Sequence, residues 1–239
     1  MIKNIIFDLG GVLLDIDLIH CMKQVQALGV DFDSLSRQTA PPPDNVSKQK
    51  MAVMGEGIVA TGTTHLYQIG EISTTDFIGG IQRLCRQGTT YQQVLDAWNT
   101  CCIDIPQYRL NNVMRLRRQG YRTYMLSNTN DAHWQDIVKR CFGSIEEVNK
   151  YFDHVFLSQE MHLAKPNYDI YIEMLKEIGA DAFECLFIDD STQNVQAAAA
   201  LGFNTIHAEV SKTCGGKVVT PPVTEWIDEV DKMLAQCLC

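Results

Sequence analysis

The chain begins with a short hydrophobic run that ends abruptly in polar and glycine residues. Residues 2–7 are rich in β-branched side chains, as is typical of a central parallel strand covered on both faces. Asp8 follows directly, and Gly10 and Gly11 allow a tight turn and a close backbone approach to a ligand. Because open α/β sheets bind ligands at the carboxyl ends of their strands, Asp8 is a candidate functional residue, with a simple turn as the alternative.

Between residues 18 and 102 the hydrophobic positions recur at three- and four-residue steps, which is typical of helices. The pattern predicts helices over residues 18–28, 65–69, 75–86 and 91–102. Ser73 and Asp76 have the spacing of a capping box before the third of these helices. The prolines at 41–43 and the glycines that follow them break the pattern, and no strand is predicted in this part of the chain.

From residue 106 onward the pattern alternates between helices and strands. Lys165 and Pro166 are expected to open one helix, with the proline in the first turn, and Trp226 lies in a predicted terminal helix. The strands are predicted over residues 121–126, 154–157, 184–188 and 204–207. The alternation predicts an α/β fold with a doubly wound parallel sheet. An all-helical domain of residues 17–102 is expected as an insertion into a core of residues 1–16 and 103–239.

The composition favours a cytoplasmic protein that acts on small molecules. A formal net charge of −9 argues against a nucleic-acid partner, and Arg115, Arg117 and Arg118 are interpreted as a solvated helix face. No apolar stretch reaches the length of about twenty residues that crosses a membrane. The nine cysteines lack paired metal-ligand spacing and are interpreted as reduced thiols, although Cys237 and Cys239 could hold a metal.

Three predicted strands end in polar residues that the sheet should bring to one edge. These residues are Asp8, then Ser127 and Asn128, then Asp189 and Asp190, and Lys165 lies on a further loop of the same polarity. Carboxylates that converge in this way repel one another unless a cation is bound. Oxygen ligands with open positions favour Mg²⁺ over zinc, so the sequence predicts a magnesium site. A helix N-terminal cap remains the alternative for Asp189.

The order of these motifs resembles that of the haloacid dehalogenase superfamily. The resemblance rests on Asp8-Leu-Gly-Gly-Val, Ser127-Asn-Thr-Asn, Lys165-Pro and Asp189-Asp-Ser-Thr-Gln-Asn194, and covers residues 1 to about 207. Within the superfamily, the chain is most similar to small sugar-phosphate phosphatases, including the α-D-glucose-1-phosphate phosphatase subgroup. It implies a HAD-like Rossmannoid core with a type 1 helical cap.

The resemblance also implies a role for each motif. Asp8 would be the nucleophile that becomes an aspartyl-phosphate, and Ser127, Asn128 and Lys165 would hold the phosphoryl group. The magnesium ligands would be Asp8, the backbone carbonyl of Gly10 and Asp190, with Asp189 and Asn194 as ligands or supports. Most phosphatases of the superfamily carry a second aspartate where this chain has Gly10, so the usual general acid is missing.

The expected function is hydrolysis of a small phosphorylated metabolite, such as a sugar phosphate, by a Mg²⁺-dependent phosphatase. One alternative is a metal-independent 2-haloacid dehalogenase, against which the pair Asp189 and Asp190 argues. Another, suggested by Gly10, is a weakly catalytic binding or regulatory protein of the same fold. In the helical domain, Tyr67 and Trp98 are interpreted as core residues rather than substrate contacts. The substrate, the oligomeric state and the role of residues 39–62 are left open.

Overall fold

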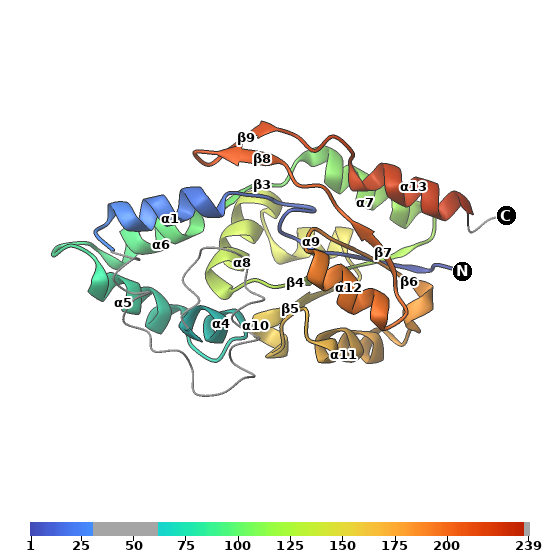
Figure 1. Ribbon diagram of the computed structural model, residues 1–239, viewed down its shortest axis with the longest axis horizontal. Helices are drawn as coiled ribbons and strands as arrows, with labels where there is room; N and C mark the ends of the chain where they lie inside the picture. The colour runs from blue at the N-terminus through green and yellow to red at the C-terminus, as the bar shows by residue number, and fades with distance from the viewer. Residues whose placement is uncertain (31–61, 237–239) are drawn as a thin grey trace.

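The computed structural model describes residues 1–30 and 62–236 (Figure 1). The predicted break at residues 41–44, most of the segment 39–62, and Cys237 and Cys239 lie outside the described residues. No helix in the described part of the chain combines the length and apolar character needed to cross a membrane.

A parallel sheet of five strands forms the centre of the molecule, in the order β5-β4-β1-β6-β7. Hydrogen bonds join β1 to β4 and to β6, so the strand that precedes Asp8 lies in the middle of the sheet. The strands are β1 (Asn4–Phe7), β4 (Arg122–Ser127), β5 (His154–Leu157), β6 (Cys185–Asp189) and β7 (Asn204–His207). The parallel sheet and the doubly wound α/β fold confirm the sequence-based prediction.

Helices cover both faces of this sheet because its strands are apolar on both sides. Ile5 and Phe7 of β1 point into one core and Ile6 points into a second, and each core is shared with a group of helices. The first group includes α7 (Gln107–Arg118), α9 (Ile145–Tyr151) and α13 (Trp226–Gln236). The second comprises α11 (Tyr168–Ile178) and α12 (Thr192–Ala200). These two layers are seen above and below the strands in Figure 1.

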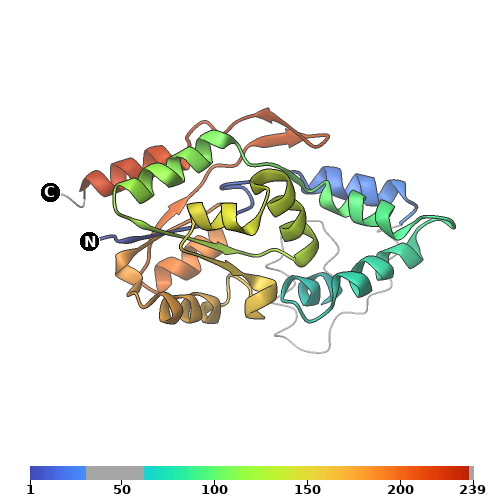
Figure 2. The same ribbon diagram turned by 180° about the vertical axis from the view of Figure 1, so that it is seen from behind.

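Four further helices gather beyond one end of the sheet, away from both termini (Figures 1 and 2). They are α1 (Leu18–Ala27), α4 (Gly62–Gln68), α5 (Thr74–Leu84) and α6 (Tyr91–Asn99). Tyr67 stacks on Phe77, and Trp98 packs edge-on against the same ring, so both aromatics are core residues as interpreted. Ser73 caps α5 by accepting a hydrogen bond from the Asp76 N–H group, as its spacing predicts.

The short elements of the structure were not predicted from the sequence. Strands β2 (Asp15–Ile16) and β3 (Cys102–Asp104) pair where the chain leaves and re-enters the core, and β8 (Lys212–Cys214) pairs with β9 (Lys217–Thr220). The others are α10 (Ser158–Met161) and η2 (Ala182–Glu184). Strands β2, β3, β8 and β9 lie outside the five-stranded sheet and lack the buried apolar runs of its strands, so tertiary contacts specify them. By contrast, α8 (Asp131–Ile137) carries Trp134 and Ile137 at helical spacing, as the sequence pattern predicts, and continues into a π-helical turn, η1 (Val138–Phe142).

The predicted start of α11 was wrong. Lys165 and Pro166 precede the helix, which begins at Tyr168 after Asn167 accepts a hydrogen bond from the Asp169 N–H group. The Lys165–Pro166 peptide bond is cis, and both residues lie in the turn that precedes the helix. Lys165 is therefore held by a loop.

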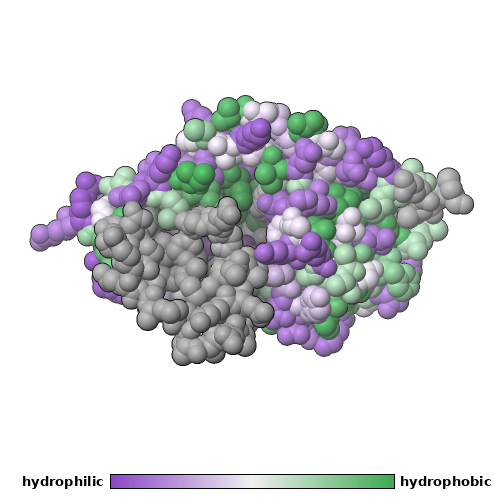
Figure 3. All heavy atoms as spheres, in the orientation of Figure 1, coloured by the Kyte–Doolittle hydropathy of each residue, from purple (hydrophilic) through white to green (hydrophobic). Residues whose placement is uncertain are grey.

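The distribution of polar, charged and apolar side chains on the surface agrees with what the composition indicates. On the face seen in Figure 3, hydrophilic side chains are interspersed among hydrophobic ones over the described residues. Two of the arginines near the end of α7 form ion pairs within the chain, Arg115 with Asp231 and Arg117 with Asp153. These pairs use the positive charges locally, in agreement with the interpretation of a solvated helix face.

Candidate active site

The predicted site residues meet at the carboxyl edge of the sheet. Phe7 is in register with Met125 of β4 and Ile188 of β6, so Asp8 lies beside the ends of both neighbouring strands. The Asp8 N–H group donates to the Ile188 carbonyl at 2.9 Å, which continues the ladder for one more residue. The edge therefore brings Asp8, Ser127 and Asp189 together, as the strand pattern predicts.

A compact turn follows Asp8 and brings the chain close to Asp190. The N–H groups of Leu13 and Leu14 both donate to the Leu9 carbonyl, and Gly11 has a φ angle of +79°. A β-carbon at Gly11 would lie 2.5 Å from an Asp190 carboxylate oxygen, closer than any real contact. Glycine is therefore required here both for the backbone conformation and for the approach of Asp190.

Lys165 links two of the three carboxylates. Its Nζ atom lies 2.8 Å from Oδ1 of Asp8 and 2.7 Å from Oδ2 of Asp189, and it donates a further hydrogen bond of 2.8 Å to the Leu126 carbonyl. The ammonium thus has three acceptors in a buried position, which satisfies its three N–H donors. Burial alone would lower the pKa of Lys165, but the charges of Asp189 and Asp8 outweigh it and raise the pKa.

Lys165 brings one positive charge to three neighbouring carboxylates. Oxygen atoms of Asp8, Asp189 and Asp190 lie within 4.8 Å of one another. Burial is the main cause that raises the pKa of Asp8 to about 7, and the charges of Asp189 and Asp190 raise it further. Burial and the neighbouring Asp189 likewise raise the pKa of Asp190 to about 6. A cluster of hard oxygen donors with this excess charge fits a divalent cation such as Mg²⁺.

Asp189 differs from the other two carboxylates because protein donors surround it. Besides Lys165, it accepts hydrogen bonds from the Ser191 N–H group at 2.8 Å and from the Asn194 amide at 3.0 and 3.1 Å. The cap of α12 is Ser191, so Asp189 is not the helix cap that the sequence left as an alternative. Its carboxylate holds Lys165 in place, whereas the carboxylate oxygens of Asp8 and Asp190 have more lone pairs available for a ligand.

Asn128 also acts on Lys165. Its side-chain amide donates to the Lys165 carbonyl at 2.8 Å and accepts from the Lys165 N–H group at 2.9 Å. These two hydrogen bonds tie the loop after β4 to the loop that carries the lysine. The side chain of Asn128 is therefore committed to positioning Lys165, while Ser127 lies buried at the end of β4 beside Asp8.

A serine that sequence reasoning missed joins the helical insertion to this edge. The Ser158 hydroxyl donates to the Gln68 carbonyl at 2.7 Å and accepts from the Thr129 N–H group at 3.0 Å. It connects the end of α4 to the loop that follows Ser127. Its position directly after β5, at the same edge as Ser127, was a signal that the sequence contained.

Asp15 and Asp17 have structural roles. Asp17 caps α1 by accepting from the His20 N–H group at 2.8 Å. Asp15 forms a buried ion pair with Arg109 at 2.9 Å, a contact that the sequence did not indicate. Neither carboxylate is placed to replace the general acid that is missing at Gly10.

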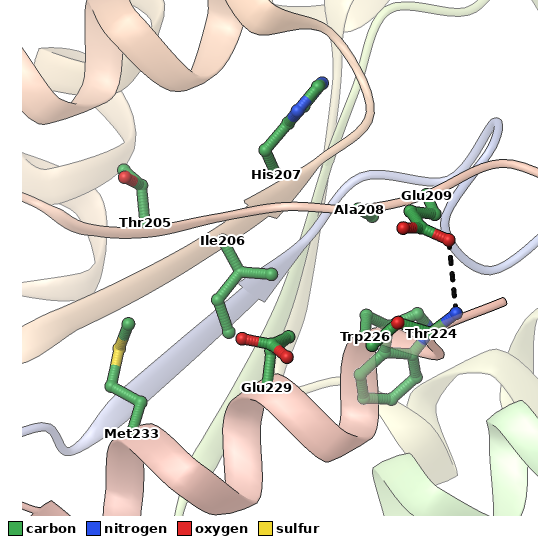
Figure 4. A pocket seen from close by; sticks show the side chains of 9 residues that line it. All are labelled: Thr205, Ile206, His207, Ala208, Glu209, Thr224, Trp226, Glu229 and Met233. Atoms are coloured by element: carbon green, nitrogen blue, oxygen red, sulfur yellow. Dashed lines mark hydrogen bonds between the residues drawn. The ribbon is translucent and has the colours of Figure 1, made fainter. Parts of the chain in front are cut away.

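A separate hollow of about 290 Å³ lies between β7 and α13 (Figure 4). Its residues come from these two elements and from the segments beside them, including His207, Glu209 and Trp226. None of the predicted site residues lines it. It is therefore distinct from the edge that carries the carboxylates.

Comparisons with known proteins agree with this geometry. The chain is 29% identical over 210 residues to a D-ribitol-5-phosphate phosphatase from Bacteroides thetaiotaomicron, covering 87% of this chain and 93% of that protein. A crystal structure of a HAD family enzyme from the same organism, in complex with magnesium and inorganic phosphate, matches with 31% identity and a TM-score of 0.72. That match covers 89% of this chain and 97% of the other.

A HAD-like family hydrolase from Porphyromonas gingivalis matches over 98% of both chains, with 28% identity and a TM-score of 0.71. The sequence model of the haloacid dehalogenase-like hydrolase family matches residues 2–202. These findings confirm the predictions of a phosphatase-type hydrolase and of magnesium as its cofactor. The chain belongs to the haloacid dehalogenase-like hydrolase family, as the order of its four motifs predicts.

Proposed function

We propose that this protein is a Mg²⁺-dependent phosphatase that hydrolyses a small phosphorylated metabolite, with Asp8 as its nucleophile. The observation that carries the proposal is the contact of Lys165 with both Asp8 and Asp189 at the carboxyl edge of the sheet. The lysine orients the Asp8 carboxylate, leaving its second oxygen for attack on phosphorus. It also supplies a positive charge where the phosphoryl group would lie.

The proposed reaction has two steps on Asp8. Its carboxylate attacks phosphorus and forms an aspartyl-phosphate, while the bond to the leaving oxygen breaks and that oxygen takes a proton from solvent. Water then attacks the aspartyl-phosphate and releases inorganic phosphate, which restores Asp8. Ser127 and the backbone N–H groups of its loop would donate hydrogen bonds to the phosphoryl oxygens in both steps.

Asp8, Asp190 and the carbonyl of Gly10 would hold the magnesium ion, with Asp189 acting through Lys165. The bound ion would neutralise charge on the nucleophile and on the phosphoryl group. Because burial raises the pKa of Asp8 to about 7, a bound cation would favour its ionised form at neutral pH. The charge excess of the carboxylate cluster thus supports a metal-dependent reaction over the metal-independent dehalogenase.

The substrate class is proposed from the similarity to a characterised relative. We propose a polyol or sugar phosphate, which is supported by the similarity to the D-ribitol-5-phosphate phosphatase. Residues 17–102 are proposed to form a cap over a core of residues 1–16 and 103–239, with Ser158 and Gln68 in contact across the boundary. We also propose a cytoplasmic location, which the free thiols of the described cysteines support.

The test is release of phosphate from p-nitrophenyl phosphate and from a panel of polyol and sugar phosphates. Wild type, Asp8→Asn and the exposed control Asp228→Asn are assayed with Mg²⁺ and with EDTA. We expect metal-dependent turnover in wild type and control, and loss of turnover in Asp8→Asn. Asp8→Asn with full activity would refute the mechanism. Binding of Mg²⁺ without turnover of any compound would favour the weakly catalytic binding protein, and metal-independent chloride release from 2-chloropropionate would favour the dehalogenase.

A further inference from the structure

A second group of metal-ligating side chains lies away from the carboxylates. The thiols of Cys101 and Cys102 and a ring nitrogen of His133 lie within 4.8 Å of one another. Cys101 and Cys102 are buried, at 5% and 7% exposure, and His133 is half-buried. Three ligands of this kind come together only through the fold, because α8 carries the histidine and the thiols follow α6.

The surroundings of these groups favour a cation. The thiols follow the C-terminal end of α6, where the carbonyl groups and the helix dipole present negative charge. The Trp98 carbonyl in this last turn already accepts from the Cys101 N–H group, from the Cys21 thiol at 3.3 Å and from His133 at 3.1 Å. A third thiol, Cys21 of α1, therefore borders the same cluster.

The donor atoms of these groups suit a soft metal. The two thiols offer sulfur and the imidazole of His133 offers a ring nitrogen, which are the ligands that thiophilic ions prefer. A metal ion that binds here must displace the thiol protons, which thiophilic ions such as Zn²⁺ do and Mg²⁺ does not.

We propose that Cys101, Cys102 and His133 form a second metal site, for Zn²⁺ or a similar thiophilic ion, distinct from the magnesium site. Tetrahedral zinc holds its sulfur and nitrogen ligands about 3.5 to 3.8 Å apart, so atoms that lie within 4.8 Å of one another need to approach by about 1 Å at most. Cys21 or water fills the fourth position. The hydrogen bond that His133 now makes through its ligand nitrogen is exchanged for the metal bond.

An ion at this place connects two parts of the proposed catalytic unit. Cys102 begins β3, which pairs with β2 where the chain returns from the helical insertion. His133 lies on α8, directly after the loop that starts with Ser127. Metal binding therefore holds strand β3 against helix α8, which follows the loop that starts with Ser127. This inference does not depend on the phosphatase mechanism, because binding is measured without substrate.

The first test uses Co²⁺ as a spectroscopic probe on the full chain, reduced and saturated with Mg²⁺ so that the carboxylates are occupied. We expect a thiolate-to-cobalt charge-transfer band that saturates at one equivalent and that Zn²⁺ removes. The band should disappear in Cys101→Ser/Cys102→Ser. It should persist in Cys185→Ser, a buried thiol in β6, and in Cys237→Ser/Cys239→Ser, which removes the terminal thiols.

A second measurement needs no variant and so does not depend on how the substituted chains fold. Wild-type protein is alkylated with iodoacetamide with and without Zn²⁺, and each cysteine is followed by mass spectrometry. We expect Zn²⁺ to protect Cys101 and Cys102 but not the exposed Cys214 or the buried Cys185. Equal protection of all thiols, no protection of Cys101 and Cys102, or a band that depends on Cys237 and Cys239 would overturn the proposal.

Discussion

The Nζ atom of Lys165 lies 2.7 Å from Oδ2 of Asp189, and neither side chain is exposed to solvent. The same Nζ atom lies 2.8 Å from Asp8, so a single buried cation compensates two carboxylates. Breaking a buried ion pair leaves an uncompensated charge, whereas removing both partners avoids that cost. This relationship makes Lys165 important for folding as well as for the proposed chemistry.

Replacing Lys165 with methionine should therefore cost both stability and activity. We expect Lys165→Met to lower the free energy of unfolding by about 3–5 kcal/mol and to abolish turnover. The exposed Lys176→Met, which breaks an ion pair with Glu173, should cost less than about 1 kcal/mol. Urea denaturation measures the free energy of unfolding of both variants. The double variant Lys165→Met/Asp189→Asn should recover part of the stability but none of the activity; recovered activity would exclude a direct role for Lys165.

Restoring the missing carboxylate at position 10 should increase turnover. A β-carbon at Gly10 would make only ordinary contacts, the nearest being 3.6 Å from Ile16, so Gly10→Asp fits the turn. General acid–base help is worth about 10² to 10⁴ in rate, and we expect a gain toward the lower figure on sugar phosphates. The gain should be small on p-nitrophenyl phosphate, whose leaving group needs little protonation. A similar gain in Gly10→Asn would show that acid catalysis is not its cause.

Magnesium affinity should rise with pH. Because the pKa of Asp8 is raised to about 7 and that of Asp190 to about 6, protons compete with Mg²⁺ for the same oxygens. The dissociation constant should fall about tenfold per pH unit for each proton displaced between pH 5.5 and 7, and level off above pH 7. Calorimetric titrations across this range measure it. A dissociation constant that stays constant from pH 5.5 to 7 would contradict these protonation states.

The raised pKa values of Asp8 and Asp190 also predict how the stability of the metal-free protein depends on pH. A carboxyl group whose pKa is raised on folding stays protonated while the unfolded chain ionises, so stability falls as pH rises from about 4 to 7. Saturating Mg²⁺ should remove this loss, because the ion favours the ionised folded state. Melting temperatures with Mg²⁺ and with EDTA should therefore diverge as pH increases over this interval.

Asp17 provides a test of the link between the turn after Asp8 and the helical insertion. Its carboxylate caps α1 and also accepts from the Gly216 N–H group at 3.0 Å, which anchors the β8–β9 hairpin to the same point. Asp17→Ala should cost about 1–2 kcal/mol and also change KM. Ser144→Ala, which removes the cap of α9 in the core, should lower stability by a similar amount and leave KM unchanged. Equal KM values in both variants would argue against such a link.

The edge on which the site lies could be predicted because buried parallel strands have a strong local signal. The apolar runs before Asp8, Ser127 and Asp189 specify strands, and in a parallel sheet all strand ends of one polarity meet. The sequence also indicated a tight turn at Gly11. The reason that glycine is needed there, the close approach of Asp190, is seen only in the folded structure.

Sequence alone thus determined the α/β fold, the strand ends and the residue types of the proposed site, because hydrophobic period and motif order are local properties. Only the tertiary structure decided which side chains interact. Asp189 and Asn128 hold Lys165, Arg109 pairs with Asp15, and His133 lies close to Cys101. These contacts join residues far apart in the chain, and pairing at such separations depends on how the helices and strands pack in space rather than on any pattern along the sequence.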